Sequence, residues 1–290
     1  MQNTKKPYDT DNTVVIQYNM TNDYMFRYIL QKNKKVLLGL ICALLHLKPE
    51  CILSVEIQNP IDLSKNITGK DFVLDIKVLL NNNQLINLEM QVKNEFNWAE
   101  RSLTYLCRAF DQLQSGQEYE ETLPVIHIGF TNFTLFPDTP EFYATYRMIN
   151  IKNHSQVYSD KFTLSVVDLT QTDNATEEDK SSKIDYWARL FRAKTWEELQ
   201  MLAQNDEYLQ EAATSIRIAN EAEIVREQCR AREDALRRER TLERDNNRLL
   251  AENASQQEQI ASQQVQISSL QDENALLRKQ LAEFQAQTSK

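Results

Sequence analysis

The chain has 290 residues, of which 41% are apolar and 26% are charged. This length and composition suffice for a packed core and about two domains, which excludes a chain that is disordered throughout. A dedicated nucleic-acid-binding protein is usually basic overall, whereas this chain has a formal net charge of −9, so a nucleic-acid partner would have to meet a local basic patch.

The spacing of cysteine and histidine argues against a zinc site or a disulfide framework. The four cysteines include no CxxC pair, and the three histidines form neither an HxxxH nor an HExxH pattern. The longest apolar run, 36–47, has 12 residues, which is too short for a membrane helix. The N-terminal residues lack the apolar stretch of a signal peptide, so we expect a cytoplasmic protein with no membrane segment.

Helical patterns come first along the chain. A helix is expected to begin after Thr21 or Asn22. A second helix runs from about Lys34, carries one apolar stripe and ends before Pro49.

Strand patterns follow the two helices. Short β-rich runs with alternating apolar residues lie at 52–57, 72–80, 85–92 and 125–130, and a helix after Asn97 separates the last two. The order is therefore helix, three strands, helix, strand. Further strands are expected at 143–151 and 162–169, linked by an Asn-rich turn at Lys152-Asn153.

The last 150 residues contain no helix breaker, because no glycine or proline follows Pro140. The helical pattern begins at Lys183, and Thr195-Trp196-Glu197-Glu198 is a capping box that starts another helix.

A seven-residue period marks the C-terminal part. The heptads ASQQEQI and ASQQVQI follow one another at 254–260 and 261–267. The d positions are then Leu242, Leu249, Gln256, Gln263, Leu270, Leu277 and Phe284, and the a positions are Asn246, Asn253, Ile260, Ile267, Asn274 and Leu281. Asparagine at a favours a parallel, two-stranded coiled coil, so we expect a homodimer. The alternative is a single solvated helix of glutamine-rich low complexity.

Two acidic residues occupy the same face of neighbouring strands. If 81–83 is a three-residue hairpin loop, paired residue numbers sum to 164, which sets Asp75 opposite Glu89. Two like charges at this distance destabilise a sheet unless a proton or a hard cation offsets them. The pair is therefore a candidate Mg²⁺ site for phosphodiester hydrolysis. The alternative is a charged solvent face on which this pair has no function.

Several separated blocks resemble a known family. They are GKDFVLDIKV, INLEMQVKNEFNWAERSLTYL, GQEYEETLPVIHIGF and DYWARLFRAKTWEELQMLA. Together they resemble the recombination-promoting nuclease (Rpn) family of transposase-related proteins, within the PD-(D/E)XK nuclease superfamily. The resemblance covers roughly 22–216 and leaves out the coiled coil.

The resemblance implies roles for particular residues. Asp75 matches the first metal-binding acid and Glu89 the second, while Gln91 occupies the place where the superfamily usually has a catalytic Lys. Gln91 can hold a water molecule but supplies no charge, and Lys93 on the same face is a possible substitute. Asp23 matches an acid that some members use as an extra metal ligand; its alternative role is that of a helix N-terminal acid.

The helix after Asn97 carries Arg101, Tyr105 and Arg108 along one side. The resemblance implies that Arg101 and Tyr105 steer the phosphate backbone or support the metal-binding acids. The alternative is an ordinary polar helix face. His127, in a strand-like run, has the pattern of a core or edge residue.

These observations predict an α/β protein with a restriction-endonuclease-like core, a mixed central sheet flanked by helices. The predicted segments are an N-terminal arm at 1–20, the nuclease-like domain at 21–170, a helical extension at 171–215 and the coiled coil at 216–290. The expected function is that of a Mg²⁺-dependent (or Mn²⁺-dependent) DNA endonuclease in recombination or transposition. The alternative is a catalytically degenerate nuclease fold that binds DNA or protein and is dimerised by its coiled coil.

Overall fold

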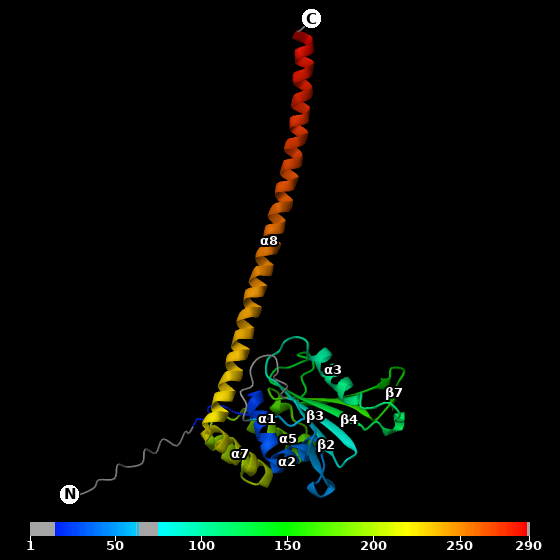
Figure 1. Ribbon diagram of the computed structural model, residues 1–290, viewed down its shortest axis with the longest axis vertical. Coiled ribbons are helices and arrows are strands. Elements are labelled where there is room, and N and C mark those ends of the chain that lie inside the picture. The colour runs from blue at the N-terminus through cyan, green and yellow to red at the C-terminus, as the bar shows by residue number, and fades with distance from the viewer. Residues whose placement is uncertain (1–14, 62, 64–74, 289–290) are drawn as a thin grey trace, which may run out of the picture. The chain divides into compact units, whose positions relative to one another are not determined.

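The computed structural model describes residues 15–61, 63 and 75–288. The chain divides into two compact units, one that ends at Glu233 and one that begins at Asp234. The first unit contains a mixed sheet with helices on both faces, and the second is part of one long helix (Figure 1). This is the restriction-endonuclease-like α/β fold expected from the sequence.

The main sheet has six strands in the order β1-β2-β3-β4-β8-β5. Their bounds are Val55–Ile57 for β1, Ile76–Leu80 for β2, Gln84–Gln91 for β3, Val125–Thr131 for β4, Tyr143–Arg147 for β5 and Phe162–Asp168 for β8. Strands β1, β2 and β3 form an antiparallel meander, and β3, β4 and β8 are parallel. Strand β5 closes the edge in antiparallel orientation. The parallel strands therefore end together at one edge of the sheet.

The hairpin between β2 and β3 has the predicted register. Ile76 pairs with Leu88 and Leu80 pairs with Gln84, so paired numbers sum to 164. Asn81 and Asn82 take positive φ angles of 50° and 55°, which asparagine tolerates better than most residues. The first three residues of the strand expected at 72–80 lie outside the described residues.

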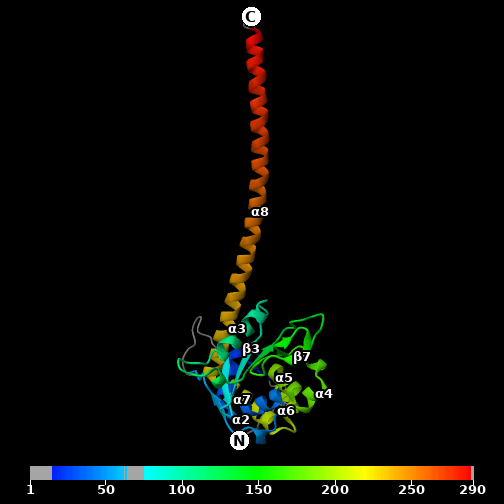
Figure 2. The ribbon, with the colours of Figure 1, turned by 90° about the vertical axis from the view of Figure 1, so that its right-hand side faces the viewer.

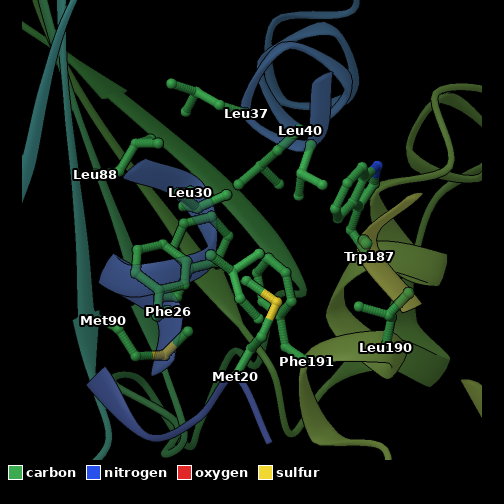
Figure 3. Close-up of a cluster of buried hydrophobic side chains, with 14 of the residues drawn as sticks. Met20, Phe26, Leu30, Leu37, Leu40, Leu88, Met90, Trp187, Leu190 and Phe191 are labelled. Carbon is green, nitrogen blue, oxygen red and sulfur yellow. The ribbon is translucent and has the colours of Figure 1, made fainter. Parts of the chain in front are cut away.

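Helices α1, α2, α5 and α7 share the large core on one side of the sheet, where α1 contacts β3 and α7 packs on α1 and α2 (Figures 1 and 2). Their bounds are Asp23–Lys32, Lys34–Leu45, Ile184–Arg192 and Glu207–Glu221. The side chain of Asn22 caps the N-terminus of α1, where the sequence predicts a helix to begin. In Figure 3, Phe26 of α1 and Phe191 of α5 pack with Leu88 and Met90 of β3 in the large core between these layers. The helices after residue 170 thus share a core with the sheet.

Helix α3 (Trp98–Phe110) packs on the opposite face of the sheet. It buries Leu106 and Ala109 against Leu85 and Val125 in a second, smaller cluster. The shorter helices are η1 (Pro49–Cys51), η3 (Tyr119–Glu121), η4 (Thr172–Asn174), α4 (Glu177–Ser181) and α6 (Trp196–Ala203). Helix α6 begins at the capping box predicted from Thr195 and Glu198.

The turn at Lys152-Asn153 does not link the two strands expected on either side of it. The segment 143–151 divides into β5 and a short β6 (Ile149–Asn150), which pairs with β7 (Asn153–Val157) in a separate two-stranded sheet. The Asn150 side chain accepts a hydrogen bond from the backbone N–H of Lys152 at 2.9 Å and so closes the β6–β7 turn. Strand β8, which begins at Phe162, pairs with β5 and β4 in the main sheet.

Helix α8 (Glu223–Thr288) is continuous over 66 residues. Its first part belongs to the first unit, where Val225 and Cys229 are fully buried. In the second unit the apolar residues of the heptads are more than half exposed; they are Leu242, Leu249, Ile260, Ile267, Leu270, Leu277 and Leu281. The expected helix is confirmed, while its pairing with a second copy stays a prediction. Within the described residues, none of the helices combines the length and the apolar character needed to cross a bilayer.

Candidate active site

Asp75 and Glu89 lie on the sheet face that α3 covers. Asp75 directly precedes β2, whose first residue, Ile76, pairs with Leu88. The same register therefore brings Asp75 next to Glu89. Consistent with this, the Asp75 carboxylate contributes to raising the pKa of Glu89.

Backbone contacts hold Asp75 in place. The guanidinium of Arg27, which is fully buried in α1, donates hydrogen bonds to the carbonyl oxygens of Asp75 and Asn59. The Asn59 side chain also donates to the Asp75 carbonyl at 3.0 Å and accepts from the N–H of Lys77 at 2.8 Å. These bonds use the Asp75 backbone and not its carboxylate.

Glu89 is only 4% exposed, yet its two oxygens have different surroundings. Arg101 Nε donates to Oε1 at 2.7 Å, while Oε2 lies 3.6 Å from Nε2 of His127. Burial raises the pKa of Glu89, and the positive charge and hydrogen bond of Arg101 oppose this rise. Burial likewise raises the pKa of Asp75, against the charge of Arg27. The protein therefore holds two carboxyl groups in a site that disfavours their ionisation.

His127 of β4 belongs to this site. Its Nδ1 lies 3.0 Å from the Asn87 side-chain nitrogen, which can only donate, so Nδ1 accepts and Nε2 carries the proton that faces Glu89. Burial, with a contribution from Arg101, lowers the pKa of His127 to about 4, so the ring is neutral at pH 7. The sequence did not indicate this role, because parallel pairing of Asn87 with His127 is a tertiary feature.

The residues predicted along α3 come together above this site. The guanidinium carbons of Arg101 and Arg108 lie 5.4 and 5.9 Å from the ring centre of Tyr105. That ring stacks over His127 at 6.3 Å between ring centres. Arg101, Tyr105 and Arg108 thus share one side of α3, as expected, and Arg101 contacts a proposed metal-binding acid directly.

The remaining predicted residues lie around or apart from the pair. Gln91 follows Glu89 on the same face of β3, and its Nε2 donates to the carbonyl oxygen of Lys93 at 2.9 Å. Asp23 forms an ion pair with Arg232 of α8 at 2.6 Å. In the part of the chain that the structure describes, no group of three or more His, Cys, Asp or Glu side chains is placed to hold a metal ion. The role of Asp23 as an extra ligand remains a prediction.

The two acids fit a divalent cation by their donor atoms. Asp75 Oδ1 and Glu89 Oε2 are buried and have no hydrogen-bond partner among the described residues. An unpaired buried carboxylate oxygen is costly, and a hard cation is the partner that satisfies two of them together.

A model of the PD-(D/E)XK nuclease family transposases matches residues 20–245, which include the sheet, the flanking helices and both acids. The chain belongs to this family. Comparison with curated proteins and with solved structures gave no match. PD-(D/E)XK nucleases generally use divalent metal ions, and membership in a nuclease family implies a DNA substrate. The match extends beyond the expected similarity at 22–216 and reaches into α8.

Proposed function

We propose that this PD-(D/E)XK nuclease family transposase is a DNA endonuclease dependent on Mg²⁺ or Mn²⁺, acting in transposition or recombination. The observation that carries the proposal is a pair of buried oxygens on neighbouring strands, Asp75 Oδ1 and Glu89 Oε2, which have no hydrogen-bond partner within the described part of the chain. These two carboxylates would hold the ion. A bound ion would polarise the scissile phosphate and lower the pKa of water.

The surrounding residues support this chemistry. Arg101 fixes one oxygen of Glu89 and leaves the other for the ion. Arg101 and Arg108 supply positive charge at the site, which attracts the phosphate chain despite the net charge of −9. Gln91, held by its bond to the Lys93 carbonyl, would orient the attacking water by hydrogen bonding, and Lys93 would add charge.

We also propose that the second unit forms a parallel two-stranded coiled coil. The exposed apolar heptad residues of α8 support this pairing, because burial of such a stripe is what stabilises a long helix. A dimer would bring two sites to one duplex and allow both strands to be cut.

The decisive experiment is plasmid cleavage by the full chain with Mg²⁺ or Mn²⁺, compared with Asp75→Ala and Glu89→Ala. We expect cleavage by the wild type and none by either variant. Cleavage retained by either variant would assign the activity to other residues or to a contaminant.

A second candidate function is DNA binding without hydrolysis. The observation that favours it is Gln91, which supplies no charge where the superfamily usually has Lys. Tight DNA binding by the wild type with no cleavage in either metal would select this candidate.

A further inference from the structure

Two adjoining cavities lie beside the proposed site, on the same face of the sheet. The larger, of about 380 Å³, lies against the start of α3, and the smaller, of about 170 Å³, lies against the ends of β4 and β8. They share four lining residues, Leu135, Phe136, Tyr146 and Val166, and therefore adjoin.

Strand register places these cavities close to the acids. Glu89 pairs with Gly129, and Gly129 pairs with Val166, which lines both cavities. Adjacent strands are about 4.8 Å apart, so Val166 lies about 10 Å from Glu89 in the same row of the sheet. A nucleotide next to a phosphate held at Asp75 and Glu89 can reach this distance.

Aromatic side chains line the larger cavity. Phe96, Phe136 and Tyr146 are 90%, 55% and 40% exposed, which is unusual for large apolar side chains that gather around one hollow. Phe96 also has a positive φ of 56°, a strained conformation for a residue of this size. The rings of Phe136 and Tyr146 lie 6.5 Å apart, edge to face. Exposed aromatic rings are the usual platforms for stacking nucleobases.

Buried polar atoms also line the same two cavities. Trp98 lines the larger one, and Thr131 and Asp168 line the smaller one. Trp98 Nε1, Thr131 Oγ1 and Asp168 Oδ2 are buried and find no hydrogen-bond partner among the described residues. The lining therefore offers one donor, one hydroxyl and one carboxylate oxygen to a planar polar ligand.

The negative charge of the lining favours a neutral base over a phosphate group. Glu100 lines the larger cavity, and Glu141 and Asp168 line the smaller one. These carboxylates repel a phosphate, whereas a neutral base with an exocyclic amino group can donate to them. The arginines Arg101 and Arg108 remain outside these linings, on the proposed phosphate path.

We propose that the two cavities bind an unpaired nucleobase next to the cleaved phosphate, with preference for bases that carry an amino group. This inference rests on the proposed DNA substrate and adds a structural selectivity to it. A paired base is stacked inside the duplex, so the cavities favour single-stranded, mismatched or extruded nucleotides.

The test is DNA binding by the full chain, measured by fluorescence anisotropy with Ca²⁺ in place of Mg²⁺. The probes are a fully paired duplex, the same duplex with a central bubble of cytosines, and one with a bubble of thymines. We expect the cytosine bubble to bind most tightly, the thymine bubble less tightly and the paired duplex most weakly.

Variants of the lining residues test whether the two cavities cause the preference for bubble DNA. Phe136→Leu and Tyr146→Leu keep an apolar side chain but remove the ring, and each should weaken bubble binding by about 5- to 100-fold while paired-duplex binding stays the same. Tyr158→Leu is the matched control, because Tyr158 is exposed and lines neither cavity. Asp168→Asn should reduce the difference between cytosine and thymine bubbles. Unfolding temperatures of all four variants check that they are folded.

The outcomes separate this inference from the proposed function. Bubble preference that Tyr146→Leu abolishes supports the base cavity even if plasmid is not cleaved. Plasmid cleavage with equal affinity for paired and bubble DNA would overturn the base cavity and leave the nuclease. An unchanged bubble affinity in both ring variants would also overturn it.

Discussion

The Nε2 of His127 lies 3.6 Å from Oε2 of Glu89, and Nδ1 of the same ring lies 3.0 Å from the side-chain nitrogen of Asn87. The neutral imidazole therefore lies between a buried amide and a proposed metal-binding acid. Contacts of this kind orient a ligand and tune its basicity without touching the metal. We therefore expect His127 to act as a positioning residue for Glu89.

Replacing either Asn87 or His127 should weaken metal binding at Glu89. We expect Asn87→Ala and His127→Phe to lower cleavage and Mg²⁺ affinity by about 10- to 100-fold, because Glu89 loses its fixed orientation. Calorimetric titration of Mg²⁺ and plasmid cleavage measure the two effects. Ser165→Ala is the control, since Ser165 is buried in β8 and does not contact Glu89. Full metal affinity in His127→Phe would contradict a positioning role.

His127 should also make stability depend on pH. Its pKa is lowered from 6.5 to about 4, so the folded protein binds fewer protons than the unfolded chain between these values. The stability that the neutral ring contributes is present above pH 6.5 and is lost as the pH falls toward 4, on the order of 3 kcal/mol. Urea unfolding at pH 7 and pH 4.5 should show a smaller difference for His127→Gln than for the wild type. An equal loss of stability between pH 7 and pH 4.5 in the wild type and in His127→Gln would show that His127 does not cause the pH dependence.

The paired acids should destabilise the metal-free protein at neutral pH. The pKa values of Asp75 and Glu89 are raised, so stability is lost as the pH rises through those values. We expect Asp75→Asn to raise the unfolding temperature of the metal-free protein by a few degrees. Mg²⁺ should raise that temperature in the wild type but not in Asp75→Asn. Asp138→Asn, at an exposed loop position, is the control and should respond to Mg²⁺ as the wild type does.

Gly129 is required for the close approach of α3 to the sheet. A Cβ atom at this position would lie 2.0 Å from Cζ2 of Trp98. We expect Gly129→Ala to displace Trp98, destabilise the fold by about 1–3 kcal/mol and lower cleavage. Thermal unfolding and tryptophan fluorescence measure the displacement. Gly116→Ala is the control, because a Cβ atom at this position would have no atom within 4 Å. This variant should be destabilised only by the positive φ of 93° at this position, and its cleavage should be unchanged. Wild-type fluorescence and stability in Gly129→Ala would show that the contact is not needed.

The coiled coil should determine the oligomeric state. We expect sedimentation of the wild type to give a dimer and the double variant Leu270→Asp/Leu277→Asp to give a monomer, because charges at d positions cannot be buried in the pair. Ser268→Asp adds a charge at an outer heptad position and should remain dimeric. A monomeric wild type at micromolar concentration would remove the proposal of two sites acting on one duplex.

Local patterns determined much of the fold. The side chain of Asn22 caps α1, the box of Thr195 and Glu198 begins α6, and each was readable because capping depends on neighbouring residues. The facing of Asp75 and Glu89 was also readable, since a short hairpin loop and two-residue alternation fix the register.

The sequence by itself determined the pair of acids, the helix that carries Arg101 and the long heptad helix. Only the tertiary structure brought His127 and Arg27 to those acids and opened the cavities beside them. The sequence also did not predict the separate β6–β7 sheet, because it used the turn at Lys152-Asn153 to link the strands at 143–151 and 162–169. The physical reason is that local spacing fixes contacts across a hairpin, whereas the register of parallel strands and the packing of distant helices are set by the whole core.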